Sequence, residues 1–358
     1  MTDLIRSLRS GPALRVTYAL AGAAILGALI LATGGQLGVA AGGWFRGAFG
    51  TGYAVSQTLV YALPIAVVAL GVSGALRAGI ITVGAEGQMI VGAIAATALS
   101  LGIGPGVPAW IALPLGALTG AAAGAAWSLL PALGRARWGM NEILATLLAN
   151  YLAGYLLKYL LRTDLRNPAG SATPQSAPIP EPFLLPQLPV AGRLHAGLLL
   201  VLLIIAVALY LGRGKRRFLL DVYGQRPLLA ARAGLGQTRA VLGTMLVSGA
   251  FAGLAGWMQL MGVDERLQPG VSAGIGFAGI AVAVLGRYHP LGILAAAVVY
   301  ASLTTGANGI QVATGSTPAA VGTVSQGILL LAAALILAVP RARRRTPQIR
   351  KALPDGQR

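Results

Sequence analysis

The sequence has no cysteine, little charge and only two histidines, His195 and His289, in 358 residues. The lack of cysteine excludes a disulfide, an iron–sulfur cluster, a thiolate zinc site and a cysteine nucleophile. The two histidines lie far apart along the chain, so we predict no metal site. Charged residues make up only 10% of the chain, whereas soluble domains carry about 25%. A soluble protein of this length could not keep its surface wet with so few charges.

Two signatures of nucleotide binding and of metal-dependent hydrolysis are missing as well. There is no Gly-x-x-x-x-Gly-Lys-Ser/Thr sequence to hold ATP, and there is no His-Glu-x-x-His sequence. We therefore expect that the chain is not an enzyme and that it binds no cofactor.

Apolar residues dominate the sequence, at 56% of the chain, and the mean hydropathy is +0.75. The net charge of +18 would be compatible with nucleic-acid binding, but the basic residues lie in short segments between apolar runs. That distribution is typical of loops held at the face of a membrane by anionic lipid. We predict a membrane protein in contact with lipid, and no nucleic-acid partner.

The apolar runs predict ten membrane spans, since one span needs about 20 apolar residues. The first run could be a signal peptide, but so many spans follow that we expect a retained helix. The runs over 86–103 and 271–286 are short, which predicts broken or re-entrant helices. The predicted fold is all-α, a polytopic membrane helix bundle with one transmembrane domain over 1–340 and a basic cytoplasmic tail over 341–358. The spans are 16–34, 54–72, 86–103, 109–131, 141–161, 194–212, 238–261, 271–286, 290–307 and 319–339.

The basic residues predict the orientation of these spans. With both termini placed in the cytoplasm, 21 of the 27 basic residues fall on the cytoplasmic side. This asymmetry obeys the positive-inside rule, and a miscount of one span would destroy it. The six basic residues that remain outside are Arg46, Lys158, Arg162, Arg166, Arg193 and Arg266.

Two connections between spans are long. Residues 163–193 fall on the periplasmic side and are rich in proline, which predicts an extended cover rather than a helix. Residues 213–237 fall on the cytoplasmic side. There, Pro227 at a first helical turn and a glycine just past the end predict a short helix over about 227–233, lying on the cytoplasmic face.

The most informative polar residues are Glu86 and Gln88, which interrupt the apolar and glycine-rich run Gly79–Ala93. Ionisable groups at membrane depth are costly, and they usually face the interior of a bundle or a watery cavity. In the nearby sequence, only Arg77 could neutralise the charge of Glu86. Two interpretations stay open. The pair lines a solute path or fixes a broken helix, or the carboxyl group only tethers two helices.

Four further polar residues are candidates for the same roles. Asn141 suits a helix N-cap and Glu142 suits the positive start of a helix, while the alternative is contact with a cytoplasmic partner or a gate. Asn150 lies eight residues after Glu142, two turns deeper and roughly 80° round the helix, where it can face the bundle. With Asn308, these residues join Glu86 and Gln88 as candidates for the solute pathway or for intramembrane polar contacts.

Three segments resemble the signatures of one family. Gly79–Ala93 resembles the Gly-x-Phe-Asn-Ile-Gly-Ala-Glu-Gly-Gln signature of ABC-transporter permease subunits in the branched-chain amino acid, ribose and nucleoside importer group. Met140–Ala153 is similar to that group's Asn-Glu-x-x-x-Thr-x-x-x-Asn-Tyr segment. Gly276–Gly292 is similar to its Gly-Phe-x-Gly-Ile-Ala-Val-Ala-Leu-Leu-Gly-Arg-x-x-Pro-x-Gly block. The likeness is greatest to the nucleoside-type, simple-sugar-related branch.

The resemblance implies a permease subunit of a bacterial ABC importer in the cytoplasmic (inner) membrane, which forms the solute pathway for nucleosides. It also implies partners: cytoplasmic ATPase subunits that hydrolyse ATP, a second permease subunit of the same or another kind, and an extracytoplasmic solute-binding protein. The cytoplasmic segment 213–237 would receive the motion of the ATPase. The residues assigned to this coupling role, within the family's coupling motif or directly before it, are Tyr223, Gly224, Arg226, Pro227, Ala230, Arg232 and Gly234.

Departures from the family pattern keep alternatives open. Ile81-Thr82 stands where the family has Phe-Asn, and Arg226 and Arg232 replace its Asn and Tyr. A sugar or branched-chain amino acid permease is therefore the first alternative. A less favoured one is an ion-coupled secondary transporter with Glu86 as its proton site, for which we see no convincing internal repeat. A membrane enzyme is the third, and no catalytic constellation supports it.

Overall fold

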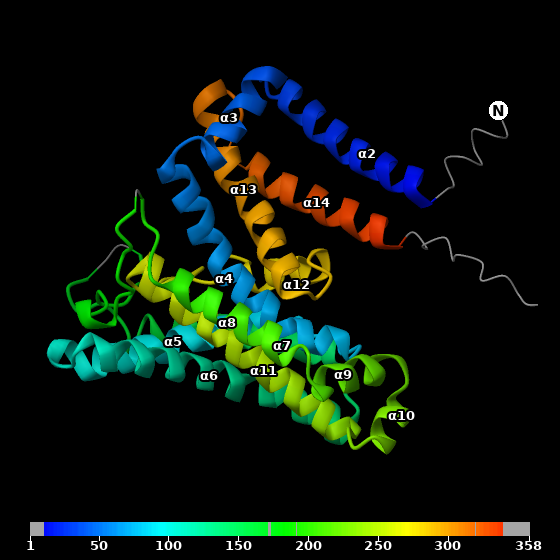
Figure 1. Cartoon of the computed structure of the whole chain (residues 1–358). Helices are drawn as coiled ribbons and strands as arrows, with labels where there is room; N and C mark the ends of the chain where they lie inside the picture. Colours follow the sequence, from blue (N-terminus) through cyan, green and yellow to red (C-terminus); the bar gives the residue numbers. More distant parts are fainter. Residues whose placement is uncertain (1–10, 171–172, 191, 319, 339–358) are drawn as a thin grey trace, which may run out of the picture.

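The computed structural model describes residues 11–170, 173–190, 192–318 and 320–338. These residues form thirteen α-helices, and their only β-pairing is an isolated bridge between Gln187 and His195 (Figure 1). The predicted all-α fold is therefore confirmed. The helices are α2 (Gly11–Ala32), α3 (Leu37–Phe49), α4 (Gly52–Arg77), α5 (Ala85–Ile103), α6 (Ala109–Trp138), α7 (Glu142–Leu160), α8 (Gly197–Leu211), α9 (Lys215–Gln225), α10 (Pro227–Arg232), α11 (Gln237–Gln259), α12 (Ile275–Leu285), α13 (Pro290–Thr314) and α14 (Val321–Ala338).

Each of the ten predicted spans coincides with one of these helices, but not all of them are long enough to cross a membrane alone. Six helices of the described chain are long and apolar enough, namely α4, α5, α6, α7, α11 and α13. The number rises to eight if the bent pairs α2–α3 and α8–α9 each count as one span. Helix α12 has only 11 residues, so the expectation of a short helix over 271–286 is confirmed. The expectation of a broken helix over 86–103 is wrong, because α5 is continuous over 19 residues.

Two helices were not predicted from the sequence. Helix α3 is 13 residues long and contains Arg46, so its apolar run is too short to be recognised as a span. Helix α9 begins with three basic residues, which suggested a loop. In both cases the helix follows a sharp bend, of 107° after α2 and of 77° after α8. The predicted short helix over 227–233 is confirmed as α10.

Small residues allow the central helices to pack closely. Gly253 of α11 lies where α11 meets α5 and α6, because a Cβ atom there would collide with the carbonyl oxygen of Gly120 and lie 3.0 Å from Gly124. A Cβ atom on Gly92 of α5 would in turn collide with Gly253. Helices in a membrane associate mainly through such close contacts, since lipid tails are as apolar as the helix surface. Glycine at 253 thus sets the packing of three helices.

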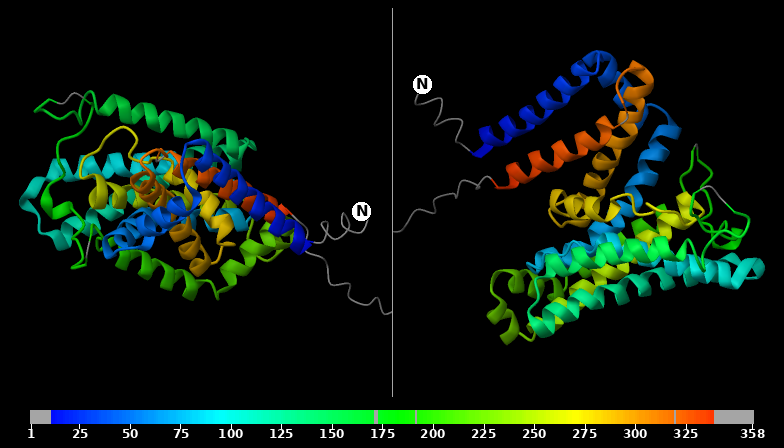
Figure 2. Two further views of the ribbon diagram at one scale, coloured as in Figure 1. Left: turned by 90° about the horizontal axis from the view of Figure 1, so that it is seen from above. Right: turned by 180° about the vertical axis from the view of Figure 1, so that it is seen from behind.

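The proline-rich connection and the helix pair α9–α10 lie at opposite ends of the bundle (Figures 1 and 2). The proline-rich connection lies at one end and is held against the α11–α12 connection by hydrogen bonds from Ser176 N to Leu267 O and from Leu185 N to Met261 O, both of 2.9 Å. Its described residues form turns up to Gly170 and a 3₁₀ turn at Glu181–Phe183, and they contain no α-helix, as the prolines predict. Helices α9 and α10 lie at the other end.

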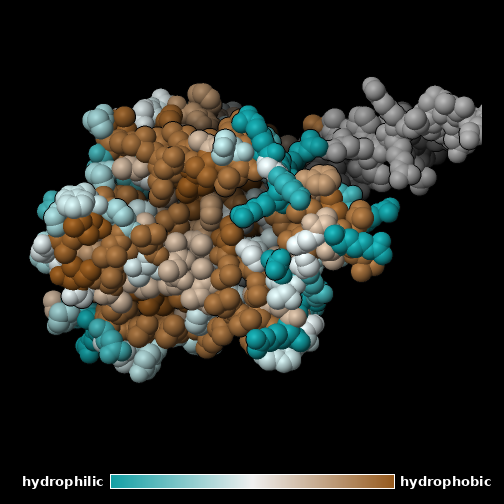
Figure 3. Space-filling model, turned by 60° about the horizontal axis from the view of Figure 1, so that its bottom comes forward, coloured by the Kyte–Doolittle hydropathy of each residue, from teal (hydrophilic) through white to brown (hydrophobic). Residues whose placement is uncertain are grey.

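The first and last described helices form a pair of their own. Helix α2 packs on α14, and in Figures 1 and 2 the two lie side by side, while α14 also packs on α13. Helix α3 packs on α13, where a Cβ atom on Gly47 would be only 2.6 Å from Gly309 Cα. Figure 3 shows that hydrophobic side chains cover most of one face of the molecule, while long hydrophilic side chains gather at the end that carries α9 and α10.

Candidate solute pathway and coupling site

Glu86 holds the start of the short helix α12. It lies in the first turn of α5, and its two carboxylate oxygens accept hydrogen bonds from Gly274 N at 3.0 Å and from Gly276 N at 2.8 Å. Gly274 is the N-cap of α12 and has a φ of 79°, which glycine adopts without strain. A carboxylate that accepts the free N–H groups of a helix start stabilises that start. The contacts agree with the interpretation that Glu86 fixes a broken helix and tethers it to α5.

Asn150 joins α7 to the chain that enters α5. Its Nδ2 donates to Val83 O and its Oδ1 accepts from Gly87 N, both at 2.9 Å. The prediction that Asn150 faces the bundle is therefore confirmed. Gln88, by contrast, is buried on α5, and its Oε1 has no hydrogen-bond partner in the described part of the chain.

Asn141 and Glu142 make local contacts at the start of α7. Asn141 Oδ1 accepts hydrogen bonds from Ile143 N at 2.9 Å and from Leu144 N at 3.3 Å, so its interpretation as an N-cap is confirmed. Glu142 forms an ion pair of 3.4 Å with Arg135, at the end of α6. These contacts fix the α6–α7 connection.

Asn308 is the one candidate that lines the cavity near the proline-rich connection. This cavity of about 770 Å³ lies between α3, the start of α4 and the end of α13. Its polar side chains include Arg46, Gln57 and Arg193, and two aromatic rings, Tyr53 and Tyr61, also line it. Glu86, Gln88, Asn141, Glu142 and Asn150 do not line it. Sequence reasoning missed its α3 residues because α3 was not recognised as a helix.

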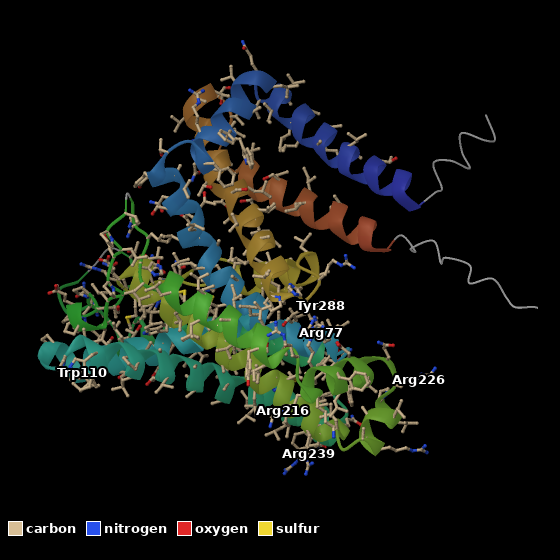
Figure 4. All side chains as sticks on the ribbon, in the orientation of Figure 1. Arg77, Trp110, Arg216, Arg226, Arg239 and Tyr288 are labelled. Atoms are coloured by element: carbon tan, nitrogen blue, oxygen red, sulfur yellow. The ribbon has the colours of Figure 1, made fainter. Side chains whose placement is uncertain are left out.

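The coupling motif divides into an anchored and an exposed part. Tyr223 and Ala230 are buried in a small apolar cluster with residues of α4, α6 and α11. Arg226, Pro227 and Arg232 are exposed on α10 and its start. Figure 4 shows Arg226 at the outer side of the α9–α10 pair. The buried motif residues therefore hold α9 and α10 against the bundle, and the exposed ones face outward.

Arg77 ties this pair to two other elements. Its guanidinium forms an ion pair of 3.0 Å with Asp221 of α9, donates a hydrogen bond of 2.7 Å to Tyr288 O, and lies 5.7 Å from the centre of the Tyr288 ring. Tyr288 belongs to the turn between α12 and α13 and has a φ of 57°, a left-handed conformation that is uncommon for a bulky residue. Figure 4 shows Arg77 and Tyr288 next to each other at this junction.

Gly224 of α9 lies very close to the backbone at the end of α4. A Cβ atom at this position would collide with the carbonyl oxygen of Arg77. The α9–α10 pair therefore lies directly against the end of α4. Sequence reasoning identified Gly224 by resemblance and Arg77 only as a neighbour of Glu86, whereas Arg77 contacts Asp221 instead.

One stretch has the spacing of a catalytic motif. Residues 270–274 read Gly-Val-Ser-Ala-Gly, but a nucleophilic Ser of the Gly-x-Ser-x-Gly type sits between a strand and a helix. Here the stretch forms the turn before α12, in a described chain without strands of its own. Among the described residues, no three His, Asp or Glu side chains gather closely enough to hold a metal ion.

The described chain is a multi-pass helix bundle with a cavity at one end and an anchored, outward-facing helix pair at the other, an arrangement that fits a membrane permease. The chain belongs to the family described as branched-chain amino acid transport system, permease component, which matches residues 54–334. The resemblance seen in the three motif segments is thereby confirmed.

The similar proteins with known roles are permeases of ABC transporters. A glucose ABC transporter permease of Haloferax volcanii is 32% identical, over 78% of this chain and 75% of its own. A guanosine ABC transporter permease of Bacillus subtilis is 32% identical, over 86% of this chain and 89% of its own. A nucleoside ABC transporter permease of Lactococcus lactis is 27% identical, over 74% of this chain and 75% of its own. No solved structure matches the chain significantly.

Proposed function

We propose that the chain forms the solute pathway of an ABC importer for nucleosides in a bacterial cytoplasmic membrane. Two relatives whose names specify guanosine and nucleosides support this solute class, and the Bacillus subtilis relative is covered over 89% of its length. The assembly would add a second permease subunit, cytoplasmic ATPase subunits that hydrolyse ATP, and an extracytoplasmic solute-binding protein. The chain itself would carry no catalytic residue.

The observation that carries the proposal is that two helices run from the coupling junction to the cavity. Helix α4 carries Arg77 at its end and Tyr53, Gln57 and Tyr61 at its start, a separation of about 36 Å for 24 residues. Helix α13 begins two residues after Tyr288 and carries Asn308 in the cavity. Motion of α9 and α10 would reach the cavity through both helices at once.

The cavity suits a polar solute with a planar ring. The rings of Tyr53 and Tyr61 offer flat apolar surfaces, on which a nucleobase can stack. The amides of Gln57 and Asn308 offer donors and acceptors for the edge of a base or for ribose hydroxyls. We expect weak binding here, because the external protein captures the solute and the permease has to release it.

The proposed topology has ten spans, with both termini in the cytoplasm. Eight spans can be counted from length and hydropathy, and α12 and α14 would supply the other two. The basic residues in and next to α9 and α10, such as Arg216, Arg226 and Arg239 (Figure 4), support a cytoplasmic position for that end. Residues 1–340 would form one transmembrane domain. The basic tail, 341–358, lies outside the described residues.

Reconstitution with its cognate partners tests the function. Proteoliposomes that contain the permease chains, the ATPase and the binding protein should take up guanosine or adenosine only with ATP. Glucose and leucine serve as the competing solutes, because one relative is a glucose permease. Uptake of glucose or leucine alone would overturn the nucleoside assignment. Uptake by this chain alone, driven by an ion gradient, would overturn the ABC mechanism.

A separate experiment tests the contact with the ATPase. Charge reversal at Arg226 and Arg232 should weaken co-purification with the ATPase, because both side chains are exposed on the outward face. The matched control reverses the charges of Arg162 and Arg166, which follow the C-terminal end of α7 in the proline-rich connection. Unchanged co-purification of the first variant would contradict the proposed contact.

A further inference from the structure

A second cavity of about 780 Å³ lies where α8 turns into α9. Its walls come from α4, the end of α8, the start of α9, α11 and the α12–α13 turn. Since α8 and α9 meet at 77°, α9 crosses the end of the bundle instead of continuing through it. In the orientation proposed above, this cavity lies at the cytoplasmic surface of the membrane.

The inner part of the cavity is apolar. Leu70 of α4 and both Val247 and Phe251 of α11 line it, and the lining as a whole is mainly apolar. Tyr210 and Leu211 extend this surface at the end of α8, where both side chains are exposed. An apolar recess of this size, beside exposed apolar side chains, would hold water poorly and suits a hydrocarbon chain.

The rim of the cavity is strongly basic. Arg213, Lys215 and Arg216 line it and are exposed. The ion pairs found in the described part of the chain are Arg77–Asp221 and Arg135–Glu142, so these three side chains have no acidic partner there. Three unpaired positive charges beside an apolar recess are complementary to a molecule with a negative head and an apolar tail.

We propose that this cavity binds an anionic phospholipid of the cytoplasmic leaflet. The phosphate of the headgroup lies among Arg213, Lys215 and Arg216, and one acyl chain lies along Leu70 and Phe251. Basic pockets between membrane helices on the cytoplasmic side are suited to such headgroups. The inference rests on the proposed orientation of the chain, and it does not depend on which solute is transported. The bound lipid would lie next to Arg77 and Tyr288, which also line the cavity.

The charge of the rim is tested with purified full-length chain in detergent and native mass spectrometry. Phosphatidylglycerol should remain bound at about tenfold lower concentration than phosphatidylcholine, and the preference should weaken at high salt. The triple variant Arg213→Gln, Lys215→Gln, Arg216→Gln should lose most of this preference. The control Arg226→Gln, Arg232→Gln, Arg239→Gln removes the same charge at the same end, outside the cavity, and should keep it.

The apolar recess is tested independently of charge. Gly74 lines the cavity, and a Cβ atom added there would meet nothing within 4 Å. The side chain of Gly74→Leu should therefore extend into the recess, and its Cβ atom should displace no neighbouring atom. This variant should release phosphatidylglycerol although all basic residues remain. Gly243→Leu is the control, because Gly243 is equally open but lies outside the cavity. Inorganic phosphate should not displace the lipid, since it has no acyl chain.

Three outcomes would overturn the proposal. Equal loss in the two charge variants would mean that the whole basic face attracts lipid without a site. Retention of lipid by Gly74→Leu would show that the recess holds no acyl chain. Loss of ATPase co-purification in the Arg213, Lys215 and Arg216 variant, with lipid binding unchanged, would assign the rim to a protein partner. None of these readouts requires transport, so they remain informative if the nucleoside assignment fails.

Discussion

The guanidinium of Arg77 lies 3.0 Å from the carboxylate of Asp221, although 144 residues separate them in the sequence. The same guanidinium holds the carbonyl oxygen of Tyr288. Arg77 thus joins the end of α4, the helix α9 and the α12–α13 turn at one point. Because the ion pair is partly exposed, it contributes little to the free energy of folding, and its main effect is to position the three elements.

Asp221→Asn should uncouple ATP hydrolysis from uptake. The substitution removes the charge that holds Arg77 to α9, and it should lower the free energy of unfolding by less than about 1 kcal/mol, since the pair is partly exposed. We expect uptake per ATP hydrolysed to fall at least about fivefold. Glu142→Gln breaks the Arg135 ion pair, which does not involve α9, and should leave the ratio unchanged. Normal coupling in Asp221→Asn would refute this role of Arg77.

Gly224→Ala should disturb the same junction by bulk. The new methyl group would collide with the carbonyl oxygen of Arg77. This oxygen belongs to the backbone, so a change of side-chain rotamer cannot relieve the collision. We expect a loss of about 1–3 kcal/mol in thermal unfolding, with reduced coupling. Gly74→Ala on α4 is the control, since its Cβ has open space. Equal stability of the two variants would contradict the close approach.

Glu86→Gln should loosen the start of α12. It removes the charge that accepts the N–H groups of Gly274 and Gly276, at a cost of about 1–3 kcal/mol. Hydrogen exchange at these two amides should accelerate, while amides in the middle of α13 serve as the internal reference. Because Glu86 does not line the cavity near Asn308, uptake per folded transporter should stay within about twofold. A far larger loss of uptake in well-folded protein would assign Glu86 to the pathway.

Gln88→Met should cost little or increase stability. The buried Oε1 has no hydrogen-bond partner among the described residues, so the wild-type side chain already bears the cost of an unpaired acceptor. We expect a change of at most about 1 kcal/mol in either direction. A severe loss of uptake without loss of stability would show instead that the amide serves the solute.

His195 should make stability depend on pH. Burial lowers the pKa of His195 from 6.5 to about 4, because the charged imidazole would be out of water. Between these values the unfolded chain binds a proton that the folded chain does not, so stability falls as the pH decreases from 6.5 to 4. The full effect is about 3 kcal/mol. His195→Gln should flatten the pH profile of thermal unfolding, and His289→Gln, at an exposed position, should not.

The sequence predicted those features that depend on local pattern. Apolar runs located ten helices, Pro227 located the start of α10, and Asn141 was recognised as an N-cap. It could not predict α3, because a 13-residue helix that contains Arg46 is shorter than any span. It also could not show that α2 packs on α14, which depends on tertiary contacts.

The site was predicted less completely, and for a physical reason. Motif resemblance found Gly224 and Tyr223, which anchor the coupling pair. Long-range partners were missed: Arg77 was considered only as a counter-charge for Glu86, yet backbone N–H groups satisfy that carboxylate and Asp221 pairs with Arg77. The cavity side chains Tyr53 and Gln57 are ordinary residues of an apolar helix, and nothing in their spacing marks them.

Glu86 is synthesised long before the two amides that bind it. Gly274 and Gly276 lie 188 and 190 residues further along the chain. During insertion from the N-terminus, the carboxylate must therefore keep water or another partner beside it until α12 arrives. Helix α5 and helix α12 can take their final register only after Gly276 has been synthesised, which makes this contact a late step relative to the synthesis of α5.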